Sequence, residues 1–334
     1  MASRQTVAFL GPVTSYTHQA TMSAFGPDHD LVPVTTIKDV FETVQKGDAS
    51  YGVVPFENST HGPVTFTLAG LADRDGAYAA LSVCGEVYLA VHHFLLGRAD
   101  KESLSSSSPS QTSKEDGVPL TSLSHIKRIY SHPQAFGQTT AFVRKYFGTS
   151  PPEMIDTSST SRAAELAAAD ESGTSAAISS ALAAETTGLD VLARCIEDRP
   201  DNTTRFFVLT TQPSGAPTPL KQSQLPALAS PKSLVSFTVP HRSPGALADV
   251  LDCFRRAGLN LTSINSLPSL IRPFQYLFFV EFEHGDEEKT AKTDAVDGTR
   301  TDTPHERVQR VLGEVAKLAQ TYRLLGTWNK PESL

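Results

Sequence analysis

Three clusters of polar side chains follow short apolar runs, and their residue types could bind and process a small anion. They are residues 14–17 (TSYT), residues 57–62 (ENSTHG) and residues 201–205 (DNTTR). Hydroxyl and backbone N–H groups at a helix start suit an anion, and the guanidinium of Arg205 can hold a carboxylate through two parallel hydrogen bonds. Each feature alone also fits an ordinary role, because Ser and Thr commonly cap helices and a single Arg commonly lies at the surface. Together these residues indicate a site for a small carboxylate.

Motifs for cofactor binding or covalent chemistry are missing from the sequence. There is no GxGxxG, no Walker GK[ST], no GxSxG and no kinase signature, which argues against nucleotide cofactors, phosphoryl transfer and serine hydrolysis. Cys84, Cys195 and Cys253 are far apart and form no CxxC, and no HExxH is present. We therefore expect reduced thiols, no metal site and no cofactor.

The composition is that of an ordinary globular protein. Hydrophobic residues make up 39% and charged residues 19% of the 334 residues, and the net charge is −7. The length predicts two or three domains, and the mild acidic excess argues against a nucleic-acid partner. The sequence has no run of about 18 apolar residues that could span a bilayer, so we expect no membrane association and a cytoplasmic location.

Short strands that alternate with helices must position the polar clusters. Residues 7–10 and 51–55 are apolar runs that end in Gly or Pro, and a helix is expected at residues 14–25. This alternation predicts an α/β fold with a parallel sheet, in which ligand sites lie at strand ends. Residues 81–96 are expected to form one strand, and the Ser-rich residues 98–124 a disordered surface loop.

A Pro-rich stretch divides the chain into two parts. Residues 212–231 hold five prolines and little to bury, as expected for a linker. The part after it begins with a strand at residues 234–239 and carries an acidic insertion, expected to be disordered, at residues 284–303. The apolar spacing around the insertion predicts the order βαββαβ, a ferredoxin-like unit.

Taken together, these features resemble the prephenate dehydratase family, whose motifs occur here in the family's order. The C-terminal βαββαβ unit resembles the ACT domain that follows the catalytic region in that family. The resemblance implies a two-lobed, periplasmic-binding-protein-like catalytic domain at residues 5–212, a linker at 213–231 and an ACT regulatory domain at 232–330. The matching runs are residues 7–12 with 15–17, residues 52–59, residues 131–135, residues 157–164 and residues 202–206.

The resemblance implies that prephenate loses its ring hydroxyl and a carboxyl group together, giving phenylpyruvate, water and carbon dioxide without a cofactor. On the family's pattern Thr204 is the essential hydroxyl and Arg205 binds substrate, while Glu57 and Asn58 are further catalytic residues. We expect Thr204→Val to abolish turnover and Arg205→Lys mainly to raise KM. The residues expected to bind substrate are Ser15, Tyr16, Thr17, Ser59, Ser159, Thr160, Ser161, Asn202 and Phe206.

The regulatory site of the family is preserved in part. It pairs a Gly-Ala-Leu run, intact here at residues 245–247, with Glu-Ser-Arg-Pro, which reads Asn-Ser-Leu-Pro at residues 265–268. The resemblance implies L-phenylalanine as an allosteric effector and a homodimer or homotetramer, because ACT units in this family pair side by side. The residues expected to bind the effector are Gly245, Ala246, Leu247, Asn260, Leu261, Asn265 and Ser266.

The first motif departs from the family at one position. The family has Gly where this chain has Thr14. A residue with a Cβ adopts positive φ less readily than Gly, so we expect a local adjustment of the loop without loss of function.

Two other functions fit the sequence. The enzyme could act on arogenate, which carries an amino group in place of the keto oxygen of prephenate. A catalytically inactive amino-acid sensor would have the same modules, but its catalytic motif would be broken, and Thr204-Arg205-Phe206 is intact.

Overall fold

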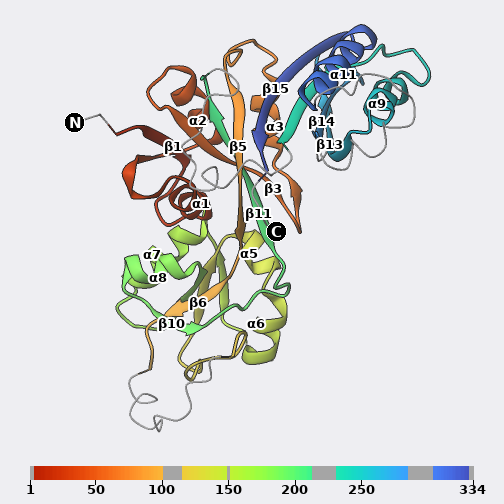
Figure 1. Ribbon diagram of the computed structural model, residues 1–334. Coiled ribbons are helices and arrows are strands. Elements are labelled where there is room, and N and C mark those ends of the chain that lie inside the picture. Colours follow the sequence, from red (N-terminus) through yellow and green to blue (C-terminus); the bar gives the residue numbers. More distant parts are fainter. Residues whose placement is uncertain (1–3, 101–114, 149–150, 213–230, 285–303, 331–334) are drawn as a thin grey trace.

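The computed structural model describes residues 4–100, 115–148, 151–212, 231–284 and 304–330. Most of the predicted linker, all of the acidic insertion after residue 284, and residues 101–114 of the Ser-rich stretch lie outside the described residues. The described chain folds into two α/β lobes and a C-terminal unit (Figure 1). None of the helices in the described ranges is long and apolar enough to cross a membrane.

The first lobe is a mixed sheet with helices on both faces. Strand β1 pairs in parallel with β2 and β3, and β11 pairs antiparallel with both β3 and β5. Helix α1 packs on one face, where Phe9, Phe25 and Phe206 form a core, and α2 and α3 pack on the other, around Phe41 and Phe207. Its strands are β1 (Thr6–Leu10), β2 (Asp30–Val34), β3 (Tyr51–Asn58), β4 (Gly62–Pro63), β5 (Ser82–Ala90) and β11 (Thr203–Thr210), and its helices α1 (Tyr16–Phe25), α2 (Ile37–Gln45) and α3 (Thr65–Ala72), with a short 3-10 turn η1 (Gly26–Asp28).

The second lobe has a five-stranded sheet in the order β10-β6-β9-β7-β8. The central strand β9 is buried along its whole length, and Ala-rich α7 can pack closely on it because its buried positions carry only small side chains. The elements are β6 (Phe94–Gly97), β7 (Arg128–Ser131), α5 (Pro133–Gly137), α6 (Thr140–Phe147), β8 (Glu153–Asp156), α7 (Thr160–Ala169), β9 (Ser175–Ser179), α8 (Ala181–Thr187) and β10 (Asp190–Ala193).

The C-terminal unit has the predicted βαββαβ order. Both helices cover one face of its antiparallel sheet, with Phe237, Phe254 and Phe282 in the core between them. Helix α9 ends before Gly258, whose φ of 68° suits a residue without a Cβ. The elements are β12 (Pro231–Thr238), α9 (Ala246–Arg256), β13 (Asn260–Pro268), β14 (Tyr276–Glu283), α11 (Pro304–Leu318) and β15 (Thr321–Asn329).

The C-terminal sheet continues the sheet of the first lobe, which the sequence did not predict. Strand β15 lies beside β5 and pairs with it in parallel at Gly326 and Val83. A Cβ at Gly326 would collide with the backbone of Val83, so only glycine permits this approach. Trp328 of β15 is 4% exposed and packs edge-on against Phe207, which extends the core beneath α2 and α3 into the C-terminal unit.

Two predicted segments differ from the structure. Residues 81–96 form two strands rather than one, because the chain passes from the first lobe to the second at residues 91–93. The Ser-rich loop was predicted to be disordered as far as residue 124, but its last part packs on the second lobe. The N–H of Leu120 donates to Leu192 O at 2.8 Å, and Leu123 is buried in the core of that lobe. These leucines supply the apolar contacts that the Ser-rich part lacks.

Candidate functional site

Two short segments join the lobes. Residues 91–93 connect β5 to β6, and residues 194–202 connect β10 to β11. They run side by side, since Val91 N donates to Asn202 O at 2.8 Å and Ile196 N donates to His93 O at 2.9 Å. The two lobes lie one above the other in Figure 1, and these segments form the junction between them.

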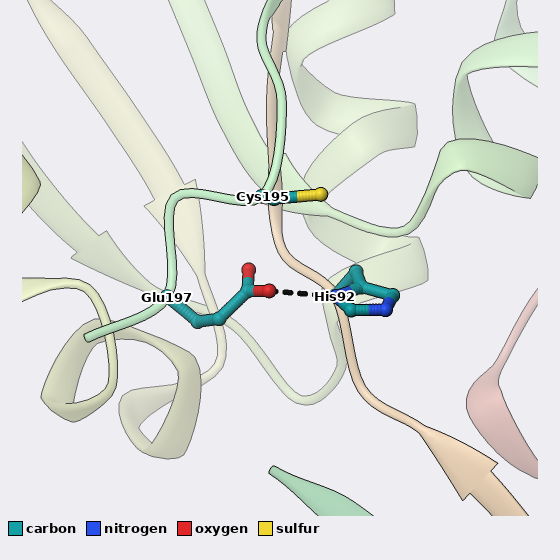
Figure 2. A group of neighbouring side chains, drawn as sticks. All are labelled: His92, Cys195 and Glu197. Atoms are coloured by element: carbon teal, nitrogen blue, oxygen red, sulfur yellow. Dashed lines mark hydrogen bonds and ion pairs between the residues drawn. The ribbon is translucent and has the colours of Figure 1, made fainter. Parts of the chain in front are cut away.

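The two joining segments are tied by a side-chain cluster shown in Figure 2. His92 Nδ1 lies 2.7 Å from Glu197 Oε1, and the backbone N–H of His93 donates to Glu197 Oε2 at 2.8 Å. Cys195 completes the group, with ligand atoms of all three side chains within 4.8 Å of one another, and within the described ranges it is the one group of this type that could hold a metal ion. Burial, with a smaller effect of a hydrogen bond to Asp116, raises the pKa of the Cys195 thiol to about 11. The thiol is thus protonated at neutral pH, and the carboxylate already has partners on both oxygens.

The prediction of no metal site therefore overlooked a possible ligand group. His92 and Glu197 are 105 positions apart, and the sequence contains no spacing signal that links them. Only the pairing of the two joining segments brings them together.

Asn58, Asn202 and Thr204 form a hydrogen-bonded cluster where β3 ends and β11 begins. Asn58 Nδ2 donates to Asn202 Oδ1 and to Thr204 Oγ1, each at 2.9 Å. The amide of Asn58 is held in this orientation because its Oδ1 accepts from the backbone N–H groups of Thr60 and His61, at 3.0 and 3.1 Å. Since Thr204 Oγ1 is an acceptor here and no described residue accepts its proton, the hydroxyl can donate to a ligand.

Tyr16 is linked to this cluster through residues of both lobes. Its hydroxyl lies 3.0 Å from His93 Nδ1, and His93 Nε2 lies 2.7 Å from Gln138 Oε1. Gln138 Nε2 in turn lies 3.1 Å from His61 Nδ1. Burial lowers the pKa of His93 and, together with the charge of Glu197, raises the pKa of Tyr16, so both side chains are neutral at physiological pH. His61 belongs to the polar cluster predicted at residues 57–62, but the sequence analysis missed His93.

The predicted hydroxyl groups at two helix starts act as caps. Ser15 Oγ accepts from His18 N at 3.2 Å at the start of α1, and Ser159 Oγ accepts from Arg162 N at 3.0 Å at the start of α7. Thr17 is buried. Ser161 Oγ is buried without a hydrogen-bond partner among the described residues.

The starts of α1 and α7 lie close together although they belong to different lobes. Ser179 Oγ donates to Thr160 O at 2.8 Å, and its neighbour Ser180 donates to Thr14 O at 3.4 Å. The adjacent residues Ser179 and Ser180 therefore link the starts of α7 and α1 at the junction of the lobes, and helix starts carry free N–H groups and a positive dipole end.

Thr14 keeps the left-handed conformation expected of the family's glycine. Its φ is 75°, so the predicted local adjustment of the loop does not avoid the positive φ. The conformation is held by two contacts, since Thr14 N donates to His18 Nδ1 at 3.1 Å and Thr14 O accepts from Ser180. These bonds offset the strain of a Cβ in this region.

Arg205 does not face the Asn58–Thr204 cluster. Adjacent residues of a strand point to opposite faces, and Arg205 lies on the face that carries α2 and α3, stacked over the rings of Phe56 and Phe207. Its guanidinium is ion-paired with Glu86, at 2.7 Å, and with Glu281, and Glu57 Oε2 lies 3.9 Å away. The sequence-based prediction that Arg205 binds a substrate carboxylate does not fit this geometry, because the guanidinium is buried and its Nε and Nη2 are already ion-paired with Glu86 and Glu281. The predicted effect of Arg205→Lys on KM loses its basis for the same reason.

Three other residues predicted for the site lie away from the Asn58–Thr204 cluster or serve to hold the fold. Phe206 is 1% exposed in the core beneath α1, so the structure contradicts its predicted contact with substrate. Ser59 Oγ accepts from Thr203 N at 3.0 Å and thereby holds the turn after β3 against β11. Glu57 lies on the face of Arg205, away from Asn58.

The C-terminal unit carries a separate cavity of about 480 Å³ beside α9. Gly245, Ala246 and Leu247 line it together with Phe274, Tyr276 and Phe278. The other predicted effector residues, Asn260, Leu261, Asn265 and Ser266, lie on β13 and are not among the residues that line it. Within one chain, only three of the seven predicted effector residues therefore share this cavity.

Known proteins resemble this chain over most of its length. The family model described as prephenate dehydratase matches residues 7–214. A bifunctional chorismate mutase/prephenate dehydratase of Aquifex aeolicus is 32% identical, over 97% of this chain and 73% of the relative, and arogenate dehydratase 1 of Petunia hybrida is 28% identical, over 96% and 66%. The structure of prephenate dehydratase from Arthrobacter aurescens in complex with L-Phe has a TM-score of 0.74 at 28% identity, covering 98% of this chain and 91% of that one.

The chain covers only part of the longer bifunctional relatives but is itself covered over most of its length. The chain spans 64% to 73% of the length of four bifunctional relatives, so their names describe longer proteins. The family model covers more than half of this chain, and the Aquifex relative exceeds 30% identity over nearly all of it. The chain therefore belongs to the prephenate dehydratase family.

Proposed function

We propose that the protein converts prephenate to phenylpyruvate, water and carbon dioxide, a step of L-phenylalanine biosynthesis, in the cytoplasm. The observation that carries the proposal is the Thr204 hydroxyl, which accepts a hydrogen bond from the fixed amide of Asn58 at 2.9 Å and keeps its own proton for a ligand. The catalytic domain is assigned to residues 5–212, followed by a linker at 213–231 and an ACT regulatory domain at 232–330.

The reaction breaks two bonds at opposite ring carbons of prephenate. The C–C bond to the ring carboxylate breaks as carbon dioxide leaves, its electron pair enters the ring, and the ring C–O bond breaks. The departing oxygen needs one proton to leave as water, and Thr204 donates it in the transition state. Asn58 Nδ2 stabilises the negative charge that develops on Thr204 Oγ1 as the proton moves away. Solvent returns the proton, so one proton is consumed overall.

The two carboxylates of prephenate need partners other than Arg205. The starts of α1 and α7 are linked at the junction of the lobes through Ser180 and Ser179, and their N–H groups and positive dipole ends suit an anion. Tyr16, at the start of α1, stays neutral at physiological pH because burial raises its pKa. The helix starts therefore replace the arginine as the anion-binding part of the site.

The cavity of the C-terminal unit is assigned to L-phenylalanine as an allosteric effector. Apolar side chains of Leu247, Phe274 and Phe278 suit a phenyl ring, and the α9 N-terminus at Gly245 suits a carboxylate. The assignment is supported by the L-Phe complex of the Arthrobacter relative. Titration calorimetry with L-phenylalanine tests it, and the absence of both heat and inhibition at millimolar effector would refute it.

We further infer that the protein is a homo-oligomer that associates through the edge strand β13. This strand ends the sheet, and apolar side chains are exposed on it and on the loop that follows, including Ile264 at 51% and Phe274 at 82%. An apolar edge strand is prone to pair with another copy. Light scattering of Ile264→Lys is expected to give a smaller assembly than the wild type, and an unchanged mass would refute this interface.

One experiment distinguishes the candidate functions of the active site. Purified protein is incubated with prephenate or with arogenate, and the products are separated by chromatography. Turnover of prephenate to phenylpyruvate supports the proposal, whereas preferential formation of L-phenylalanine from arogenate would make the protein an arogenate dehydratase. No turnover of either substrate would leave the inactive amino-acid sensor.

A further inference from the structure

Four charged side chains are buried together where the C-terminal unit meets the first lobe. Glu86 of β5 and Arg205 of β11 come from the catalytic side, and Lys232 of β12 and Glu281 of β14 from the C-terminal side. Their side chains are between 0% and 9% exposed. We call these four residues the interdomain charge cluster.

Every member of the interdomain charge cluster contacts both members of opposite charge. Arg205 pairs with Glu86 and Glu281, and Lys232 Nζ lies 3.1 Å from Glu86 Oε1 and 3.3 Å from Glu281 Oε1. Burial alone would raise the pKa of Glu281, but the charges of Arg205 and Lys232 outweigh it and hold that pKa below the usual value. Two positive and two negative charges balance, so removal of one leaves a buried charge uncompensated, which is strongly destabilising to that arrangement.

Glu281 is held firmly within its own unit. Thr262 of β13 donates to Glu281 Oε1 at 2.6 Å, and β14 pairs along its length with both β12 and β13. The Glu281 carboxylate is therefore held in place by the C-terminal sheet, and Arg205 is held by its ion pair with this carboxylate.

The interdomain charge cluster connects the regulatory cavity with the catalytic strand. Tyr276 and Phe278 of β14 line the cavity beside α9, and Glu281 projects from the same strand to the opposite face of the sheet. Arg205, which Glu281 holds, directly precedes Phe206 and follows Thr204 on β11. Glu281 and Arg205 thus link β14 to the strand that carries the Thr204 hydroxyl.

We propose that Glu281 is a positioning residue for the active site, supplied by the C-terminal unit. Through Arg205 it fixes the start of β11, and with it the distance between Thr204 and Asn58. An effector that displaces β14 acts on turnover by this route. The expected effect of Glu281 on turnover rests on the proposed function. Its role in fixing the start of β11 rests on the interdomain charge cluster alone.

The test compares Glu281→Gln with Glu283→Gln in the full-length protein. Glu283 lies two residues further along β14, pairs with Lys330 at 2.9 Å and, among the described residues, forms no ion pair with the four cluster members, so its variant is a matched control. We expect Glu281→Gln to lower kcat roughly 10- to 100-fold, because a displacement of about 1 Å at a reacting group can cost about 10²-fold. KM for prephenate is expected to stay within about threefold, since Glu281 does not touch substrate. The control variant keeps wild-type kinetics.

Two further measurements separate positioning from other effects. Glu281→Gln is expected to bind L-phenylalanine like the wild type in calorimetry, yet to lose most of the inhibition by saturating effector. Amide hydrogen exchange of residues 203–206 is expected to speed up in Glu281→Gln and not in Glu283→Gln, whatever the reaction catalysed. If the Gln variant does not fold, Thr262→Val, which removes the hydrogen bond to Glu281, is expected to give the same changes on a smaller scale.

Equal hydrogen exchange in the two Gln variants, or equal kcat and inhibition, would overturn the role of Glu281. Absence of prephenate turnover in both the wild type and the control variant would overturn the proposed function instead, and the exchange experiment would still decide whether Glu281 positions β11.

Discussion

Replacing Thr204 by Val removes the proton donor of the proposed reaction and little else. The side chain is partly exposed, and among the described residues its hydroxyl makes one hydrogen bond, accepted from Asn58 Nδ2 at 2.9 Å. General acid catalysis contributes about 10²- to 10⁴-fold, which corresponds to about 3 to 5 kcal/mol of activation free energy at about 1.36 kcal/mol per tenfold. We therefore expect kcat to fall by that factor.

The cost of the same change in folding stability should be much smaller. A single hydrogen bond contributes about 0.5–1.5 kcal/mol, and for a domain of about 200 residues about 1 kcal/mol shifts Tm by about 2–4 °C. Thr204→Val is therefore expected to lose activity while its Tm falls by no more than about 5 °C. Thr204→Ser keeps the hydroxyl and serves as the matched control.

The assay follows phenylpyruvate formation from prephenate under steady-state conditions, with Tm measured by differential scanning calorimetry on the same samples. The expected pattern is a large loss of kcat in the Val variant, near-normal kcat in the Ser variant, and similar stability in both. A Val variant with kcat within tenfold of the wild type would refute the role assigned to Thr204. Equal losses in both variants would show that the methyl group or the local packing matters, and not the hydroxyl.

Three further predictions concern the junction of the lobes. Asn58→Asp keeps the acceptor for the N–H groups of Thr60 and His61 but loses the donor to Thr204 and Asn202. Activity assays should therefore show kcat lowered at least tenfold, with Tm lowered as well because an oxygen then faces Asn202 Oδ1. Unchanged kinetics would argue against the amide's role. Burial lowers the pKa of His93 in the folded state, so the unfolded chain binds the proton more tightly. The free energy of unfolding should therefore fall as the pH drops below about 6.5. Measured Tm values of His93→Gln should depend less on pH in this range than those of the wild type. Dialysis against EDTA should leave kcat unchanged, because both oxygens of the Glu197 carboxylate already have protein partners, His92 and the backbone N–H of His93. A loss of activity that zinc restores would contradict this.

Local patterns in the sequence determined most of the elements and the chemistry they carry. Apolar runs that end in Gly or Pro predicted β1 and β3, and the helical spacing of apolar residues predicted α9 and α11, since these depend on neighbours within a few residues. The motif residues Asn58 and Thr204 were likewise named from the sequence, and the fold brings them within 2.9 Å.

Only the tertiary structure determined which face of the sheet each side chain points to and which distant segments of the chain are in contact. Thr204 and Arg205 are neighbours in one motif, but a strand sends them to opposite faces, and only the packing of β11 between β3 and β5 determines which of them meets the other lobe. The pairing of β15 with β5 then surrounds Arg205 with carboxylates from two parts of the chain. Such contacts join residues 76 or more positions apart, and no local pattern encodes them, because each segment buries its apolar surface equally well wherever a complementary surface is available.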